Sequence, residues 1–370
     1  MSAPLAGLKV VELARILAGP WIGQTLADLG AEVLKIESPQ GDDTRTWGPP
    51  FIDREHDHTA AYFHCANRGK DSIAIDFTDE ADLARLKSII AGADVLIENF
   101  KVGGLKKFGL DYDSLQAGDP KLIYCSVTGF GQDGPYSSRA GYDFLIQGMS
   151  GIMSLTGEPD GAPQKIGVAF ADVFSGLYGV IGIQAALAER NSSGLGQHID
   201  ISLLDCMTGV LANQAMNFLA SGNTPKRLGN AHPNIAPYQT FATSDGDIIV
   251  ACGNDRQFKA LCGVLNLDHL GADSRFATNP ERVKNRVALV AELGTAIQEW
   301  TKHDILRGLE TAVVPAGPIN TVAEALNDPQ IVHRGLQINP QGVPGLRTPL
   351  TFSRSKLSLS RAAPKRPRRL

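Results

Sequence analysis

Short apolar strands alternate with helical segments through the first 130 residues, and this alternation limits the possible folds most strongly. Residues 8–13 (LKVVEL) and 31–37 (AEVLKIE) have strand character, and a helix from about Pro20 to Leu29 connects them. A strand–helix–strand connection within one sheet makes its two strands parallel. The sequence therefore predicts an α/β fold around a parallel sheet, whose further strands are 71–77, 94–98 and 122–127.

The pattern changes after Ser221, and this change indicates a second domain. Loop-like sequence follows, and Thr240–Ala251 has the pattern of a hairpin around Asp245–Gly246. A chain of 370 residues with 43% apolar residues is long enough for two cores. We expect a Rossmann-like large domain over 1–224, completed by 326–370, and a smaller α+β domain over 225–325. The basic end 363–370 (APKRPRRL) is expected to be a solvated, disordered tail.

Composition argues against several classes of protein. A net charge of −4 gives no general attraction to nucleic acid or to an anionic membrane. The sequence shows no apolar run of 18 residues and no secretory signal, so a soluble cytoplasmic protein is expected. No metal site is expected either, because His56 and His58 lie in a polar, loop-like segment. The cysteines form no CxxC pair, and they are Cys65, Cys125, Cys206, Cys252 and Cys262.

The first strand–helix–strand unit resembles a dinucleotide-binding unit only in part. Glu37 ends the second strand, near the position that binds ribose in NAD enzymes. The turn ARILAGP, however, contains one glycine, Gly19, where the dinucleotide fingerprint needs three. We therefore do not expect a pyrophosphate wrapped closely by this turn.

One carboxylate stands in an unusual apolar setting. Asp172 lies in GVAFADVFSGLYG, just before a long apolar helical pattern. A carboxylate is costly to desolvate, so this position needs an explanation. Local sequence favours a helix cap, which would satisfy free N–H groups at the helix start. The alternative is a nucleophile that is kept partly dry.

Successive blocks of the chain resemble one enzyme family in order and over nearly the whole length. These blocks are LAGLKVVELARILAGPWIGQTLADLGAEVLKIESPQGDDTR, NRGKDSIAIDF, ENFKVGGLKKFGLDY, YCSVTGFGQDGPYSSRAGYD and GVAFADVFSGLYGVIGIQAALAERNSSGLGQHIDISLLD. The sequence is similar to the class III CoA-transferases, which include formyl-CoA transferase and α-methylacyl-CoA racemase. DDTRTWGPPF and GNAHPNIAPYQ resemble the succinate–hydroxymethylglutarate CoA-transferase branch. The resemblance implies an interlocked homodimer and no tightly bound cofactor, with coenzyme A and acyl-CoA as substrates.

The resemblance also assigns the reacting residues. It implies that Asp172 is the nucleophile, so the nucleophile is now preferred over the cap. The enzyme would pass through an aspartyl mixed anhydride and an aspartyl-CoA thioester. Tyr142 and Asp143 would form the wall of the site. Racemases of the family have histidine where Tyr142 stands, and a phenol with a pKa near ~10 is a poor base. The residues therefore favour a transferase over an acyl-CoA racemase or a non-catalytic CoA-binding protein.

Family positions map the CoA contacts onto three segments. The pantetheine arm would lie beside Leu17 and Ala18, and a lysine cluster that includes Lys106 would suit the phosphates. Formyl-CoA transferase has glutamine in place of Leu17, which argues against a formyl or oxalyl substrate. It has arginine in place of Ser38, so one phosphate contact of that enzyme is not expected here. The adenine and phosphate positions are Ile75, Asp76, Phe77, Thr78, Asn99, Phe100, Lys101 and Lys107.

Two further functions have candidates from loop motifs. A dicarboxylate acyl group, as in succinyl-CoA, needs a cation for its distal carboxylate, and we expect Arg45, Arg227 or His232 to provide it. The developing oxyanion needs N–H donors, for which Gly148 and Gly151 are candidates together with the second-domain loop.

Overall fold

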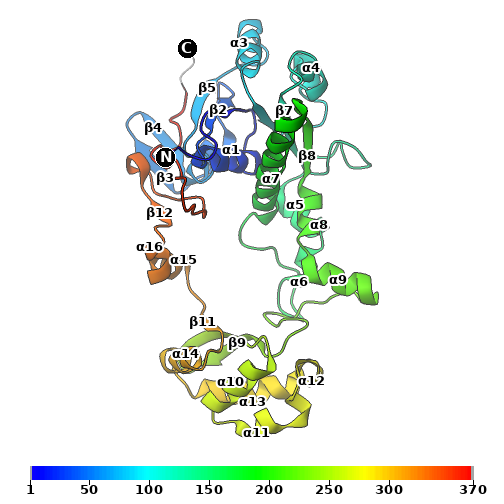
Figure 1. Ribbon diagram of the computed structural model, residues 1–370, viewed down its shortest axis with the longest axis vertical. Coiled ribbons are helices and arrows are strands. Elements are labelled where there is room, and N and C mark those ends of the chain that lie inside the picture. Colours follow the sequence, from blue (N-terminus) through cyan, green and yellow to red (C-terminus); the bar gives the residue numbers. More distant parts are fainter. Residues whose placement is uncertain (1, 368–370) are drawn as a thin grey trace. The chain divides into compact units, whose positions relative to one another are not determined.

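The chain divides into two compact units in a computed structural model that describes residues 2–367 (Figure 1). Unit 1 comprises Met1–Met153, Lys165–Asn223 and Pro329–Leu370, and unit 2 comprises Ser154–Gln164 and Thr224–Asp328. The expected division differs mainly at residues 154–164, which we had assigned to the large domain and which group with unit 2. Each unit is described by itself.

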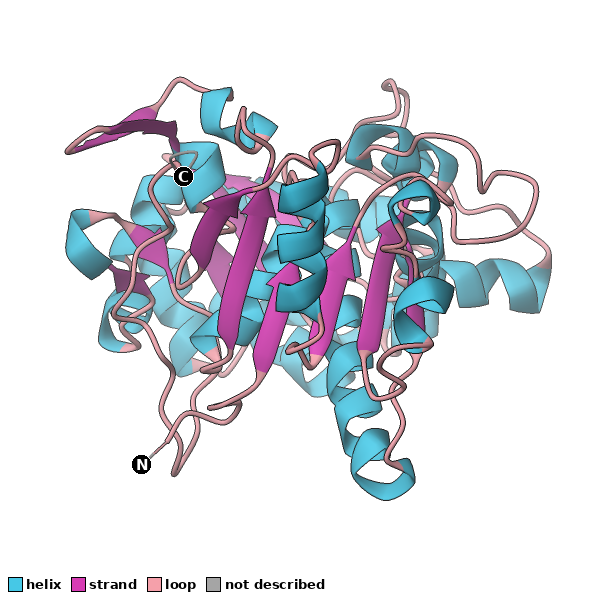
Figure 2. Cartoon of the chain, turned by 90° about the horizontal axis from the view of Figure 1, so that it is seen from above, coloured by secondary structure: helices cyan, strands magenta, loops and turns pink. Residues whose placement is uncertain are grey.

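Unit 1 is built around a parallel six-stranded sheet (Figure 2). The strands in spatial order are β5 (Asp71–Ala74), β2 (Glu32–Glu37), β1 (Lys9–Glu12), β6 (Val95–Glu98), β7 (Ile123–Thr128) and β8 (His198–Ser202). This is the order of doubly wound sheets, which start at the centre and grow to both edges. The α/β prediction is confirmed, and five strands lie where the sequence indicated; β8 was not predicted.

Side chains alternate between the two faces of the sheet, as the period of a strand requires. Val10 of β1 belongs to a core with helices α1 (Ala18–Asp28) and α7 (Phe170–Ser193), whereas Val11 belongs to a core with α3 (Glu80–Ile90). Helices α1 and α7 pack very closely. A Cβ added to Gly179 would lie 2.3 Å from a side-chain carbon of Ile22, so this contact requires glycine.

Helix α7 corrects one expectation from the sequence. By length and composition it is apolar enough to cross a membrane, although we had expected no such stretch. Part of its apolar surface is accounted for by packing, because Ala171, Val180, Ile183 and Ala186 are buried in the core of unit 1.

The C-terminal segment packs onto unit 1, so the expectation of a solvated tail is wrong for residues 363–367. Ala363 is buried, and its carbonyl accepts a 2.9 Å hydrogen bond from Arg54 Nη1. The backbone N–H of Arg366 donates to Asp57 Oδ1 at 3.0 Å. Partly buried backbone groups need such partners, and here the side chains of Arg54 and Asp57 provide them. Residues 368–370 of the predicted tail lie outside the described residues.

Shorter elements complete unit 1 around the sheet. His56 and His58 lie at and beside the tip of a β-hairpin rather than in an irregular loop. The strands of this hairpin and of a second small pair are β3 (Phe51–Arg54), β4 (Asp57–Ala60), β12 (Gln337–Ile338) and β13 (Gly345–Leu346). The helices are α2 (Ala61–His64), α4 (Tyr112–Gln116), α5 (Asp143–Met149), α8 (Leu203–Gly209), α9 (Ala212–Ser221) and α16 (Pro329–His333), with 3-10 turns η1 (Asp43–Thr46), η2 (Lys106–Phe108) and η4 (Pro340–Gly342). Helix α6 (Ile152–Leu155) crosses into the first segment of unit 2.

Unit 2 has its own core and a three-stranded antiparallel sheet. The predicted hairpin is present, and Gly246 at its turn has φ +141°, a backbone conformation that L side chains rarely adopt. Its strands are β9 (Tyr238–Thr243), β10 (Gly246–Ala251) and β11 (Ala316–Pro318). Its helices are α10 (Asp255–Val264), α11 (Asp268–Ala272), α12 (Asn279–Lys284), α13 (Arg286–Gln298), α14 (Lys302–Thr311) and α15 (Val322–Asn327), with the 3-10 turn η3 (Ser274–Phe276).

Candidate active site

A cavity of about 450 Å³ opens in unit 1 beyond the carboxyl ends of β1, β6 and β7. The turn at Arg15–Ala18 and the turn at Asn99–Val102 line it together. These turns are joined by a reciprocal pair, because Arg15 N donates to Asn99 Oδ1 (2.9 Å) and Asn99 Nδ2 donates to Arg15 O (2.7 Å). Strand order reverses between β1 and β6, and open α/β sheets bind ligands at this switch point.

Asp172 lines the cavity from the first turn of α7. The interpretation as a helix cap is wrong, because the N-cap residue is Ala169 and Asp172 lies three residues further along. The capping is done from another helix. Asp143 Oδ1 of α5 accepts a 2.8 Å hydrogen bond from the N–H of Ala171. The Asp172 carboxylate is therefore not used to cap α7.

Burial, together with the nearby carboxylate of Asp143, raises the pKa of Asp172 from 3.8 to about 7. None of the described residues, 2–367, donates a hydrogen bond that would offset these effects. A large shift of this kind in a cavity is typical of reactive groups. At neutral pH a large fraction of the Asp172 side chains is ionised, and the ionised carboxylate is poorly stabilised by its surroundings. Both properties favour attack by a nucleophile.

Asp143 is itself held firmly. Its second oxygen accepts a 2.8 Å hydrogen bond from Gln147 Nε2, one helical turn along α5. Gln147 is buried, and its Oε1 accepts from the N–H of Ile166 at 2.9 Å. Asp143 and Gln147 therefore fix the start of α7, and with it the backbone of Asp172. Sequence reasoning missed Gln147, although its spacing of four from Asp143 was a usable signal.

Tyr142 lines the cavity beside Asp172 and is 66% exposed. It precedes α5, directly after a crossing of two glycine backbones. A Cβ on Gly141 would lie 2.5 Å from the Cα of Gly129, so the loop after β7 can approach Tyr142 only if both positions are glycine. The crossing sets where Tyr142 and Asp143 lie.

Tyr62, close enough to Asp172 to be affected by its charge, and its neighbour Trp47 were not found from the sequence. Burial, together with the charge of Asp172, raises the pKa of Tyr62 to about 12. Trp47 packs edge-on against Tyr62, with 5.3 Å between ring centroids. Tyr62 therefore stays protonated near the carboxylate. No local motif marked this tyrosine.

The predicted CoA residues fall into two groups. The cavity lining includes Leu17, Ala18, Asn99, Phe100 and Lys101. The lining does not include Ile75, Asp76, Phe77, Thr78 and Lys107. The second group is connected to the first through aromatic contacts, since the Phe77 ring lies 5.9 Å from Phe100 and 5.6 Å from Phe108.

The structure adds cations that the sequence did not single out. Arg15 and Arg139 line the cavity with Lys101, and Ser137 lies in the same lining. The guanidinium of Arg139 lies 4.5 Å from the Tyr136 ring centroid, while Arg15 forms an exposed 3.0 Å ion pair with Asp43. Their place in loops after strands was the signal that could have found them.

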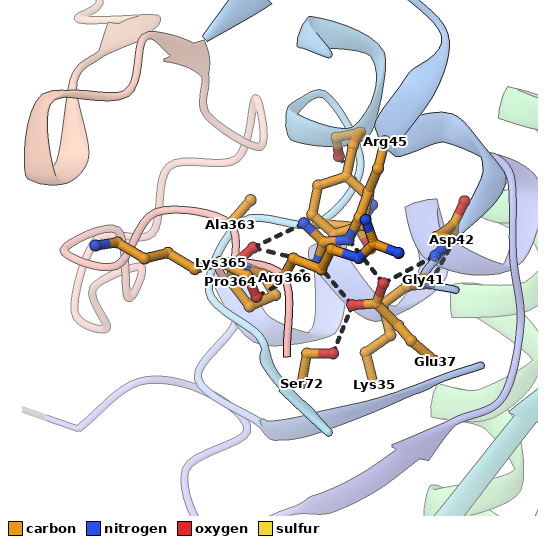
Figure 3. Close-up of polar contacts among 12 residues, drawn as sticks. Lys35, Glu37, Gly41, Asp42, Arg45, Ser72, Ala363, Pro364, Lys365 and Arg366 are labelled. Atoms are coloured by element: carbon orange, nitrogen blue, oxygen red, sulfur yellow. Dashed lines mark hydrogen bonds and ion pairs between the residues drawn. The ribbon is translucent and has the colours of Figure 1, made fainter. Parts of the chain in front are cut away.

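Arg45 forms buried hydrogen bonds within unit 1, which contradicts its expected role as a ligand of the substrate carboxylate (Figure 3). It is 4% exposed and donates to both oxygens of Glu37, from Nε at 2.7 Å and from Nη2 at 2.6 Å. It also donates to the carbonyl of Pro364 and lies 3.6 Å from the Phe63 ring centroid. The same contacts occupy Glu37, the residue near the ribose position of NAD enzymes.

The remaining candidates are not among the residues that line the cavity. Arg227 and His232 belong to unit 2, where Arg227 donates to the carbonyls of Glu158 (3.2 Å) and Gly161 (2.7 Å). Gly148 and Gly151 are not among the residues that line the cavity. Within residues 2–367, no group of three or more His, Cys, Asp or Glu side chains is arranged to hold a metal ion.

Comparison with known proteins decides the family. Residues 5–367 match CoA-transferase family III. The chain belongs to CoA-transferase family III. It is 53% identical to a succinate–glutarate CoA-transferase of Agrobacterium fabrum, over 98% of this chain and 92% of the relative. An acetyl-CoA:oxalate CoA-transferase of Acetobacter aceti is 42% identical, over 92% of this chain and 87% of the relative.

A solved structure of a CaiB/BaiF family protein from Brucella suis is similar throughout. It is 63% identical, with a TM-score of 0.91 over 100% of this chain and 97% of that chain. The resemblance drawn from the sequence is therefore confirmed, and so is the expected class of enzyme. This family III member is a CoA-transferase that moves CoA between an acyl-CoA and a carboxylic acid.

Proposed function

We propose that this enzyme takes CoA from succinyl-CoA or a similar acyl-CoA and passes it to a dicarboxylic acid, with Asp172 as the nucleophile. The supporting observation is the position of Asp172 in the first turn of α7, facing a cavity at the switch point, with its pKa raised to about 7. Relatives named for succinate and glutarate support the substrate class.

The proposed reaction is balanced without a metal or a redox group. An oxygen of Asp172 attacks the thioester carbonyl carbon, the C–S bond breaks, and a mixed anhydride and CoA thiolate form. The thiolate attacks the aspartyl carbonyl, and the donor acid leaves as a carboxylate. The acceptor carboxylate attacks the aspartyl-CoA thioester, and a second mixed anhydride forms. The thiolate then attacks the acceptor's acyl carbon and restores Asp172.

The first turn of α1 is our proposed source of oxyanion donors, in place of Gly148 and Gly151. Leu17, the N-cap residue, supplies no side-chain cap, and Leu17 and Ala18 line the same cavity as Asp172. Uncapped N–H groups at a helix start stabilise negative charge.

Lys101 and Arg139 are proposed to hold the phosphates of CoA, because both line the cavity and guanidinium and ammonium groups bind phosphate strongly. Arg227 and His232 remain our candidates for the distal carboxylate of the acyl group. Arg45 is withdrawn, because Glu37 and the C-terminal carbonyls occupy it.

We further propose a cytoplasmic homodimer. Large apolar side chains on helices of unit 1 are exposed, including Phe144 (60%), Ile181 (61%) and Leu219 (72%), and apolar patches of this kind typically mark interaction surfaces. The cysteines of the chain are free thiols, as is usual in a reducing compartment. Light scattering of wild type and of Ile181→Asp tests the dimer, and an unchanged mass for the variant would remove this surface.

Oxygen transfer tests the mechanism directly. With glutarate labelled by 18O in its carboxylates and succinyl-CoA as donor, one labelled oxygen should pass to Asp172 and from there to released succinate. Mass spectrometry of Asp172 peptides and of succinate follows the label. Asp172→Asn should abolish transfer, whereas Asp268→Asn, an exposed first-turn aspartate of α11, should leave it intact.

Two outcomes would contradict the proposal. Unlabelled succinate after many turnovers would exclude the anhydride route through an enzyme carboxylate. Deuterium entering the acyl α-carbon from heavy water would favour a racemase or isomerase instead. Acetate as an alternative acceptor, compared in Arg227→Met and His232→Asn, shows whether either residue recognises the second carboxylate.

A further inference from the structure

Glu98 is a buried carboxylate that the proposed reaction does not use. It is the last residue of the central strand β6 and is 5% exposed. Its Oε2 accepts a 2.7 Å hydrogen bond from the backbone N–H of Phe100. Phe100 lies in the middle of the Asn99–Lys101 turn, which lines the cavity proposed for CoA. The Glu98 side chain therefore holds the backbone of this turn in place through a hydrogen bond.

A chain of hydrogen bonds supports Glu98 from the next two strands. Ser126 on β7 is paired with Glu98 in the sheet, and its hydroxyl lowers the pKa of the Glu98 carboxyl by hydrogen bonding to the ionised form. The same hydroxyl lies 2.8 Å from Nε2 of His198 on β8. An ionised carboxylate can only accept, so Ser126 donates to Glu98 and accepts from the Nε2–H of His198. The His198 ring is stacked on Tyr112, at 5.0 Å between centroids, which fixes its orientation.

These groups surround a second cavity of about 50 Å³ that adjoins the CoA turn. Its lining includes Glu98, Ser126 and His198 together with Lys101 and Val102, which also line the larger cavity. The small cavity and the proposed CoA site therefore share a wall. A change in the hydrogen bonding of Glu98 can therefore alter the position of Lys101.

We propose that ionised Glu98, oriented by Ser126 and His198, is a positioning residue that sets the affinity of the Asn99–Lys101 turn for CoA, so that binding weakens when Glu98 takes up a proton. The inference rests on the proposed CoA site. Charge-assisted hydrogen bonds are about twice as strong as neutral ones, so protonation loosens the hold on the N–H of Phe100.

The electrostatic surroundings of Glu98 place its protonation near neutral pH. Burial is the main cause that raises the pKa of Glu98 from 4.5 to about 7; Ser126 and the N–H of Phe100 partly oppose it, and the charge of Asp200 on β8 adds to it. Burial lowers the pKa of His198, so its imidazole is neutral in this range. The other titratable groups around Glu98 are Lys101, Asp111, Tyr112, Tyr124 and Cys125. Burial raises the pKa values of Tyr124 and Cys125, which keeps both protonated throughout.

The test measures binding of CoA by calorimetry between about pH 5.5 and about pH 8.5, with Asp172→Asn as the background. This background removes titration of the nucleophile. We expect the dissociation constant to rise about tenfold on acidification through neutral pH, in line with loss of one charge-assisted hydrogen bond. Adding Glu98→Gln should give the weak affinity at every pH and remove the step. Titration of the CoA phosphate contributes to both binding curves, so the step assigned to Glu98 is the pH dependence in excess of this shared contribution.

Two variants on one strand separate positioning from stability. Ser126→Ala removes a bond that favours ionised Glu98, so the step in affinity should move to higher pH. Tyr124→Phe is the matched control, because it removes a buried hydroxyl that donates to the carbonyl of Leu110 at 2.9 Å and leaves the Glu98–Ser126 bond intact. Its step should stay in place even if its melting temperature falls.

The outcomes are decisive in each direction. An affinity step that persists in Glu98→Gln, or that moves equally in Ser126→Ala and Tyr124→Phe, overturns the proposal. If Glu98→Gln does not fold, the comparison of the two β7 variants decides alone. Failure of the Asp172 mechanism would appear separately, as transfer that survives Asp172→Asn, without altering these binding curves.

Discussion

The raised pKa of Asp172 has a measurable effect on the stability of the whole enzyme. Burial and the charge of Asp143 raise this pKa from 3.8 to about 7. Because the ionised form is disfavoured in the folded state, the carboxyl costs stability at every pH at which it is ionised in the unfolded chain. The variant Asp172→Asn keeps the shape of the side chain and removes this cost.

The size of the expected stabilisation follows from the difference between the two pKa values, 3.8 and about 7. Each pH unit corresponds to about 1.4 kcal/mol, so the ceiling is about 4 kcal/mol. The carboxylate opens to a cavity that admits water, and loss of its favourable interaction with the start of α7 subtracts a further ~0.3–1 kcal/mol. We therefore expect Asp172→Asn to be more stable than wild type by about 2 kcal/mol at pH 8, while transferring no CoA.

The pH dependence has a definite sign. In wild type the destabilisation is absent below about pH 4, grows as pH rises, and is complete above about pH 7. The difference in melting temperature between variant and wild type should therefore be small at pH 4 and large at pH 8. Calorimetric melting over this range, with Asp268→Asn as control, makes the measurement. A difference that is constant with pH, or a variant less stable than wild type at pH 8, would refute the reasoning.

Further predictions concern the supports of the site. Asp143→Asn removes the charge that helps raise the pKa of the nucleophile, so the acid limb of kcat should move to lower pH; an unchanged pH–rate profile would contradict this. Gly141→Ala puts a methyl 2.5 Å from the Cα of Gly129, and we expect roughly 1–3 kcal/mol loss of stability with a lower kcat, measured by denaturant unfolding and initial rates. Arg45→Met strands the buried carboxylate of Glu37 and should cost about 3–5 kcal/mol in unfolding free energy. Any remaining activity should fall equally with succinate and acetate as acceptors, and a selective loss with succinate would restore the arginine as a substrate ligand.

The sheet was largely predictable because its central strands are buried on both faces. Such strands are continuous apolar runs, as in Val95–Glu98 and Ile123–Thr128, and these stand out in a sequence. Strand β8 was missed because HIDIS mixes polar and apolar residues and follows a long helix closely. It is an edge strand, where one side of the ladder is free and polar residues are tolerated.

Site residues could be predicted where their neighbours in the sequence mark them. They could not be predicted where their role depends on partners that are distant in the sequence. Asp172 stood out from its neighbours, and the resemblance of the surrounding blocks implied the role that we propose for it. The residue that caps α7, Asp143, lies 28 positions from the N–H it accepts, so local sequence assigned the cap to the wrong aspartate. Arg45 was mistaken for a ligand for the same reason, since its acceptor in Pro364 lies 319 positions away.

The C-terminal segment has a consequence for the order in which the protein is made. Asp28, in the first helix, accepts hydrogen bonds from Arg68 and from Thr348, and its backbone carbonyl accepts one from Ser358. During synthesis the ribosome therefore completes unit 2, through Asp328, before the last segment of unit 1 exists. Until residues 348–366 emerge, Arg45 and Asp28 lack the hydrogen bonds that they form with this segment. Unit 2 can thus become compact while unit 1 still lacks its last segment.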